Sequence, residues 1–184
     1  MTERHDTPAP HVHAHWLGER FPLITAHPAG ADQHVQPHIQ RAWADVVAQN
    51  PALHDGPIWS VTTALPSAIT VRPDRYMRLT AQQDPAVGDL GVRQLGVKGF
   101  ITAVTTGGQP AVLIAQRGWR VRTYPGAWEC APAGGVDANT PPSEHAVRAA
   151  LAEEAAQELG LVIDPARPRL RAILTSGSEA ELQA

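Results

Sequence analysis

The sequence contains little cysteine, few aromatic residues and no long apolar run. Of its 184 residues only Cys130 is a cysteine, and 5% are aromatic. A single cysteine excludes a framework of intrachain disulfides and is typical of a reducing compartment. No stretch is apolar over the length of about 20 residues that a membrane-spanning helix requires. Because the pattern of a signal peptide is also missing, we expect a cytoplasmic protein.

Charge of one sign is not in excess either. The formal net charge is −3, and 18% of the residues are charged. This balance argues against nucleic acid or a membrane surface as a partner bound through bulk electrostatics. The length predicts one domain, or one domain with a small extension, and 43% hydrophobic residues can supply its core.

Residues 1–35 are rich in Pro, His and Ala and are predicted to form a disordered or loosely ordered arm. Within it His11, His13 and His15 alternate, so they would share one face of an extended segment. Such a face could bind a transition metal. We favour the alternative, in which the histidines belong to a loose polar arm or an edge strand.

Residues 36–91 are predicted to form a small unit of one helix and antiparallel strands. The helix is expected over 36–50, because Ile39 and Trp43 recur on one face and the proline after Asn50 ends it. Three strand-like runs follow, separated by turn residues: 58–64, 68–72 and 76–80.

Residues 92–184 are predicted to form the main unit, with one long helix before Gly160. Thr140 is the favoured N-cap and Ser143 the alternative, while Gly160 suits a left-handed C-terminal position. The expected strands are 94–105, 111–117, 119–123 and 169–175.

Two glutamates near the end of this helix are the strongest chemical signal. Glu154 and Glu158 are one helical turn apart, so they project from one face about 6 Å apart along the axis and repel each other. A divalent cation such as Mg²⁺ would remove that repulsion. Gly134 and Gly135 have no Cβ, so a backbone carbonyl could approach the same ion.

The stretch 132–161 resembles a Nudix box, whose second half has the pattern REUXEEXGU with U aliphatic. Glu154 falls on the glutamate of the RE pair, Gln157 and Glu158 fall on the EE pair, and Gly160 falls on the closing glycine. The loop before the helix is longer than usual. His145 stands in the slot of the first glutamate, and Glu153 stands in the slot of the arginine.

The preceding part resembles the amino-terminal half of the UDP-sugar-cleaving Nudix branch, whose members also have a lengthened box. The resemblance rests on AQNPALHDGPIWSVTTA, on Tyr76-Met, on Leu90-Gly-Val and on Val97-Lys-Gly-Phe100. It implies an α+β fold: a Nudix-type α/β/α sandwich around a mixed sheet over 92–184, with 36–91 as an amino-terminal extension.

The implied activity is Mg²⁺-dependent hydrolysis of a nucleoside diphosphate linked to another group. UDP-glucose or a related nucleotide sugar is the best candidate, and Mn²⁺ could replace Mg²⁺. Three sets of residues are implied. The metal ligands are Gly134, Glu154 and Glu158, and the catalytic residues are Glu154, Gln157 and Glu158. The substrate contacts are Arg117, Arg120 and Tyr76, and His145 and Glu153 would support the metal glutamates.

Two questions stay open in the sequence. Gln157 cannot act as a base, so the chain could instead be a degenerate, weakly active or inactive Nudix module that binds a nucleotide or a protein. Little sequence follows the last predicted strand, so the chain could be truncated at Ala184. If it is complete, one sheet face is exposed or covered by a partner, for example in a homodimer.

Overall fold

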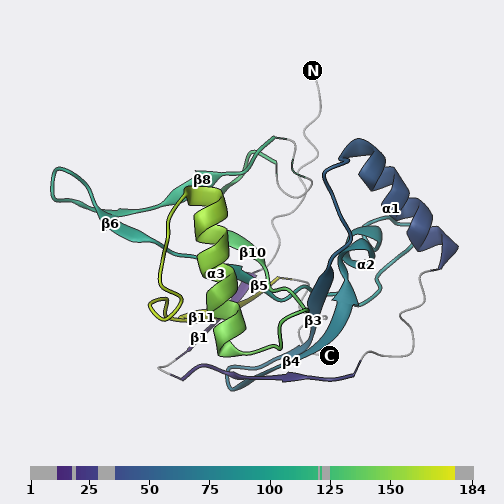
Figure 1. Ribbon diagram of the computed structural model, residues 1–184, viewed down its shortest axis with the longest axis horizontal. Coiled ribbons are helices and arrows are strands. Elements are labelled where there is room, and N and C mark those ends of the chain that lie inside the picture. The colour runs from purple at the N-terminus through teal and green to yellow at the C-terminus, as the bar shows by residue number, and fades with distance from the viewer. Residues whose placement is uncertain (1–11, 18–19, 29–35, 120, 122–124, 177–184) are drawn as a thin grey trace.

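The computed structural model describes residues 12–17, 20–28, 36–119, 121 and 125–176, which form a mixture of short strands and three helices (Figure 1). The elements in chain order are β1 (Val12–Trp16), β2 (Leu23–Ala26), α1 (Pro37–Gln49), β3 (Pro57–Ala64), β4 (Ala68–Arg75), α2 (Tyr76–Ala81), β5 (Gly96–Lys98), β6 (Thr102–Val104), β7 (Pro110–Val112), β8 (Ile114–Gln116), β9 (Trp128–Cys130), β10 (Ala133–Gly135), α3 (Glu144–Leu159) and β11 (Ala172–Ser176). The predicted α+β class is confirmed.

Strand β3 lies at the centre of the molecule and joins two groups of strands. On one side it is antiparallel to β4, which pairs in parallel with β2. On the other side it meets the residues just before β5. There the Leu95 amide donates to the Trp59 carbonyl at 2.7 Å, and the Val61 amide donates to the Arg93 carbonyl at 2.6 Å. Because β5 is antiparallel to β10, these bonds connect the mixed group β2-β4-β3 to the strand that carries the glycine pair.

Helix α3 packs against β5 and β10 and closes the main core. The buried core side chains are Trp59, Ile69, Val71, Leu95, Val136 and Ala146. The Trp59 indole also donates a hydrogen bond to the Thr140 carbonyl at 3.0 Å, in the loop before α3. Burial of each large apolar side chain stabilises the fold by about 1.5–3 kcal/mol. This core therefore holds the long helix against the glycine-bearing strand.

Residues 76–80, predicted as a strand, instead form helix α2. The Met77 amide donates to Asp55 Oδ1 at 2.8 Å, and the Tyr76 amide donates to the Gly56 carbonyl at 2.9 Å. The start of α2 is thus satisfied by a turn distant in the sequence, which local patterning does not reveal. Helix α1 agrees with its prediction and packs on α2.

The predicted strands 94–105 and 111–117 are each divided in two. At the first break Gly99 packs closely on Pro132, whose Cδ lies 2.5 Å from where a Cβ on Gly99 would stand. Beyond it, β6 pairs with β7 and β8 pairs with β9 as short antiparallel ribbons. Of the predicted strand 119–123, Trp119 and Val121 are not in a strand, and the other residues lie outside the described ones.

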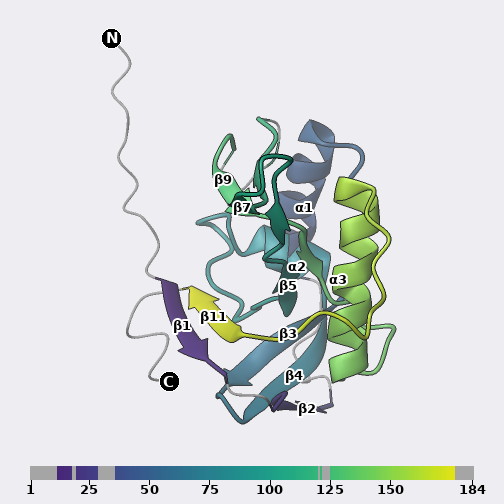
Figure 2. The ribbon, with the colours of Figure 1, turned by 90° about the vertical axis from the view of Figure 1, so that its left-hand side faces the viewer.

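Strands β1 and β2 correct the expectation of a loosely ordered arm for those residues. β1 is antiparallel to β11, which begins later than the predicted strand 169–175 (Figure 2). His13 and His15 lie in β1, as expected for an extended edge strand, and pair with Thr175 and Ile173. His11 lies outside the described residues. β2 forms its pairs with β4, far along the chain, so the local composition could not predict it.

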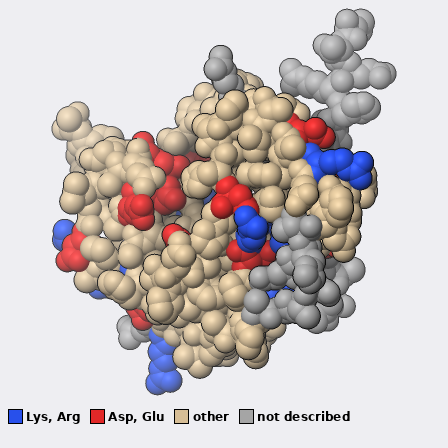
Figure 3. All heavy atoms as spheres, turned by 45° about the vertical axis from the view of Figure 1, so that its right-hand side comes forward, with Lys and Arg blue, Asp and Glu red and all other residues tan. Residues whose placement is uncertain are grey.

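The surface is mixed in both charge and polarity. On the face in Figure 3, Lys and Arg form small groups beside Asp and Glu rather than a broad field of one sign. Large apolar side chains are exposed on the β6–β9 ribbons, among them Val104 at 72%, Phe100 at 66% and Trp128 at 64%. None of the helices in the described ranges is both long and apolar enough to cross a membrane.

Replacing Asp55 should destabilise the fold through α2. Asp55→Ala removes the acceptor of the Met77 amide and an ion pair with Arg75. Loss of a helix cap of this kind costs about 1–2 kcal/mol. Urea unfolding should show that loss in the free energy of unfolding, whereas Asp45→Ala on exposed α1 should stay within about 0.5 kcal/mol of the wild type. Equal effects of the two substitutions would contradict the capping role.

Candidate functional site

Helix α3 begins and ends at residues that cap it. Ser143 is the N-cap, and its hydroxyl accepts the Ala146 amide at 3.1 Å. The alternative cap is therefore correct, and Thr140 is not the N-cap. Gly160 ends the helix in the predicted left-handed conformation, with φ 66°. In the first turns of the helix Arg148 Nε donates to Glu144 Oε1 at 2.8 Å.

The carboxylate of Glu154 lies directly on Gly134 of β10. A Cβ built on Gly134 would stand 1.7 Å from Glu154 Oε1 and 2.0 Å from its Cδ. Any side chain at this position would require the carboxylate to move away. The glycine thus leaves the space that the Glu154 side chain occupies.

Glu158 reaches the same strand one helical turn further along. Its Oε2 accepts the amide of Ala133 at 3.0 Å. Helix α3 therefore brings the predicted pair, Glu154 and Glu158, to β10 at adjacent residues. The arrangement joins two carboxylates to the glycine-containing strand, as the sequence suggested.

The hydrogen bonding of β10 changes which carbonyl faces these carboxylates. Bonds from Gly99 to the Pro132 carbonyl and from Val136 to the Leu95 carbonyl place Gly134 in a hydrogen-bonded position opposite Val97. The Gly134 carbonyl, predicted as a metal ligand, is thus directed toward β5. The Ala133 amide points away from β5, toward Glu158. The Ala133 carbonyl therefore lies at the edge of β10 that faces away from β5.

Glu154 is electrostatically unfavourable in its ionised form. Burial raises its pKa above the ordinary value of 4.5, and the nearby charges of Glu158 and Glu153 raise it further. Each of these effects favours the neutral acid over the carboxylate. A cation bound beside Glu154 would act in the opposite direction and favour the carboxylate.

The two residues expected to support the glutamates lie apart. Glu153 accepts a hydrogen bond from the Gln157 amide at 2.9 Å on the exposed side of α3. His145 lies near the beginning of the helix, about 12 Å from Glu153 along the axis. In the described part of the chain no hydrogen bond or ion pair joins His145 to Glu153. His145 and Glu153 therefore do not contact each other.

Of the predicted substrate residues, Arg117 is placed in a charged group. Arg117 and Lys98 both bind the carboxylate of Glu129, and Arg117 Nη1 lies 2.5 Å from its Oε1. Burial alone would raise the pKa of Glu129, but the hydrogen bonds from Lys98 and Arg117 outweigh it and lower that pKa. This group links β5 to the β8–β9 ribbon.

Tyr76, another predicted substrate residue, does not join this group. Tyr76 packs its ring edge-on against Trp43 of α1, with ring centroids 6.2 Å apart, and so contributes to the packing of α1 on α2. The side chain of Arg120 lies outside the described residues.

The residues present fit a divalent cation only with help from a substrate. Across the described ranges, no three His, Cys, Asp or Glu side chains are grouped in a way that would hold a metal. Mg²⁺, however, is often bound by one or two carboxylates together with phosphate oxygens and waters. Glu154, Glu158 and the Ala133 carbonyl are consistent with that mode of binding.

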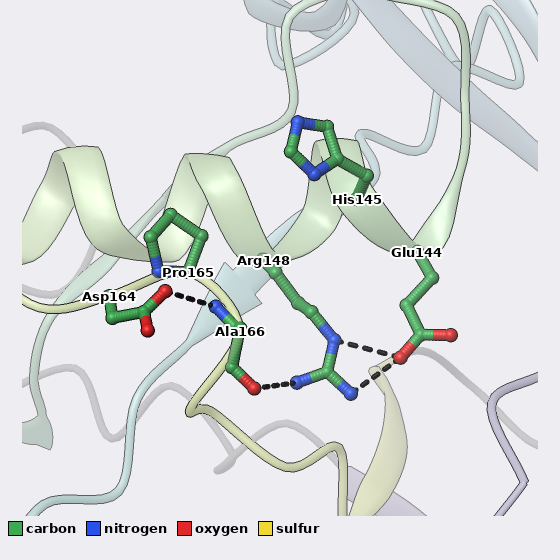
Figure 4. Close-up of a pocket in the computed structure, with 6 residues that line it drawn as sticks. All are labelled: Glu144, His145, Arg148, Asp164, Pro165 and Ala166. Carbon is green, nitrogen blue, oxygen red and sulfur yellow. Dashed lines mark hydrogen bonds and ion pairs between the residues drawn. The ribbon is translucent and has the colours of Figure 1, made fainter.

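Sequence reasoning missed the hollows at the other end of α3. Figure 4 shows the first, where Arg148 binds Glu144 and the Ala166 carbonyl while His145 projects to one side. A second hollow, lined by arginines, adjoins it through Glu144 and Arg148. The alternating arginines at 167–171 were the available sequence signal. The helix residues that line both hollows, Arg148 and Glu144, lie about 9 Å and about 15 Å along α3 from Glu154.

A scan against models of known protein families matches none of them, and a search of curated proteins likewise finds no match.

Removing the charge of Glu154 should stabilise the metal-free protein at neutral pH. Because folding raises the pKa of Glu154, its ionisation weakens the fold as pH rises from the unfolded value of 4.5 through the folded value. Glu154→Gln should therefore have a higher free energy of unfolding than the wild type at pH 7, with the difference shrinking toward pH 4. Urea titrations in EDTA measure it. An Asp45→Asn control on α1 should show no such trend, and a Glu154→Gln variant that loses stability at pH 7 would contradict the assignment.

Proposed function

We propose that this protein hydrolyses a nucleoside diphosphate linked to another group, with Mg²⁺ as the metal. The observation that carries the proposal is the approach of Glu154 and Glu158 to adjacent residues of β10. The resemblance of 132–161 to a Nudix box supports the same reaction. The single cysteine supports a cytoplasmic location.

Each residue of the group has a role that follows from its position. Glu154 and Glu158 supply two negative charges on one side of α3, and the Ala133 carbonyl adds a neutral oxygen at the edge of β10. Bound Mg²⁺ would neutralise pyrophosphate charge and make a coordinated water more acidic. Gln157 can orient a water or the substrate through its amide, but it cannot accept a proton as a base.

The charged group on β5, β8 and β9 is the proposed site for the phosphate side of the substrate. Arg117 and Lys98 bring two cationic side chains together at the carboxylate of Glu129. A guanidinium can bind phosphate oxygens through two parallel hydrogen bonds. The exposed ring of Trp128, one residue before Glu129, offers a surface on which a nucleobase could stack.

A specific observation favours a second candidate, a nucleotide-binding module with little or no turnover. Gln157 stands where a carboxylate would serve as base, and its amide is bonded to Glu153. A screen of UDP-glucose, UDP-galactose, ADP-ribose and coenzyme A with Mg²⁺ or Mn²⁺ separates the two. Release of NMP and sugar phosphate from a nucleotide sugar supports the enzyme. Saturable binding without product supports the module.

Glu158→Gln should lower turnover of the best substrate by at least about a hundredfold, because it removes a charged metal ligand from the edge of β10. The amide keeps the size of the side chain, so the thermal melting temperature should change little. Rates are measured as release of NMP from the nucleotide sugar at saturating Mg²⁺. Asp45→Asn, which removes one charge from α1, should keep the wild-type rate, and an equally active Glu158→Gln protein would refute the role of this carboxylate.

A further inference from the structure

A second hollow beside the beginning of α3 is lined mainly by arginines. It encloses about 530 Å³ between the end of β1, helix α3 and the segment that leads into β11. Its arginines come from these separate parts of the chain: Arg20, Arg148, Arg169 and Arg171. The Leu17 amide donates to the Arg171 carbonyl at 2.9 Å, which fixes the two walls beside each other.

The described residues that line this hollow carry more positive than negative charge. Among them Glu144 alone is acidic, and Arg148 Nε donates to that carboxylate at 2.8 Å. Arg20, Arg169 and Arg171 add three further positive charges in a protein whose formal net charge is −3. Like charges gathered around one hollow repel one another, and a bound anion would relieve that repulsion.

The remaining walls are apolar. Leu17, Phe21 and Leu170 line the same space and are each half-buried. A volume of this size lies within the range of about 300–1,000 Å³ that small-molecule sites occupy. Charged donors and apolar side chains around one hollow suit a ligand with an anionic head and an organic remainder.

We infer that this hollow binds a small organic phosphate, held at its phosphate by Arg169, Arg171 and Arg20 and at its organic part by Phe21 and Leu170. Phosphate suits the site better than a single carboxylate, because it carries about two negative charges and three acceptor oxygens. Its nearest lining residue on α3, Arg148, lies about 9 Å along the helix from Glu154, and neither Glu154 nor Glu158 lines the hollow, so the site is separate from the proposed catalytic group.

Calorimetric titration in EDTA tests this site apart from the proposed reaction, because no divalent metal is then present. The probes are uridine monophosphate, inorganic phosphate and acetate at constant ionic strength. The wild type should bind uridine monophosphate saturably with one site per chain. Inorganic phosphate should bind more weakly, and acetate should not compete. Failure of hydrolysis with this binding intact would overturn only the proposed activity.

The matched variants remove two positive charges each. Arg169→Gln/Arg171→Gln takes both from the hollow, and Arg41→Gln/Arg167→Gln takes both from exposed positions that do not line it. The first should weaken uridine monophosphate binding at least tenfold while its melting temperature stays near that of the wild type. The second should bind as the wild type does. Equal affinities in both variants, displacement by acetate, or no binding to the wild type at millimolar probe would overturn the inference.

Discussion

Helix α3 lies close enough to β10 for the Glu154 carboxylate to occupy the space over Gly134. No residue with a side chain fits at Gly134 while Glu154 stays in place, because a Cβ would stand 1.7 Å from Oε1. One turn further, Glu158 binds the Ala133 amide, so both carboxylates are held at the same edge. The small buried side chains Ala146 and Ala155 allow the helix to approach closely. Helix, strand and charged group are therefore positioned together.

This arrangement has an unfavourable electrostatic component in the free protein. Glu154 is partly buried beside two other glutamates, and its pKa is raised as a result. A purely structural contact could have used a neutral side chain such as glutamine, which would avoid the repulsion. Carboxylates whose pKa is raised by burial and by like charges are found at functional sites, and also in structural charge networks. The raised pKa of Glu154 thus adds to the support that the approach of both glutamates to β10 gives to the proposed cation.

The sequence predicted those features that depend on local chemistry. The span of α1 and the left-handed Gly160 follow from residues close in the chain. The approach of Glu154 to Gly134 was expected from the helical spacing of the glutamates and the small size of glycine. Helix α2 escaped prediction because its cap, Asp55, lies in a distant turn. The arginine hollow escaped because β1 and β11 bring its walls together through long-range pairing. Which carbonyl faces Glu158 depends on strand register, which residue types do not encode.

The most direct measurement of the central claim is the pKa of the Glu154 carboxyl with and without Mg²⁺. Carbon-13 labelling of glutamate side chains, with Glu154→Gln to assign the resonance, gives that pKa by NMR titration. The account predicts a value above 4.5 in EDTA and a marked decrease when Mg²⁺ is added, because the cation favours the carboxylate. A Glu154 pKa that does not respond to millimolar Mg²⁺, with or without a nucleoside diphosphate, would contradict the proposed metal site.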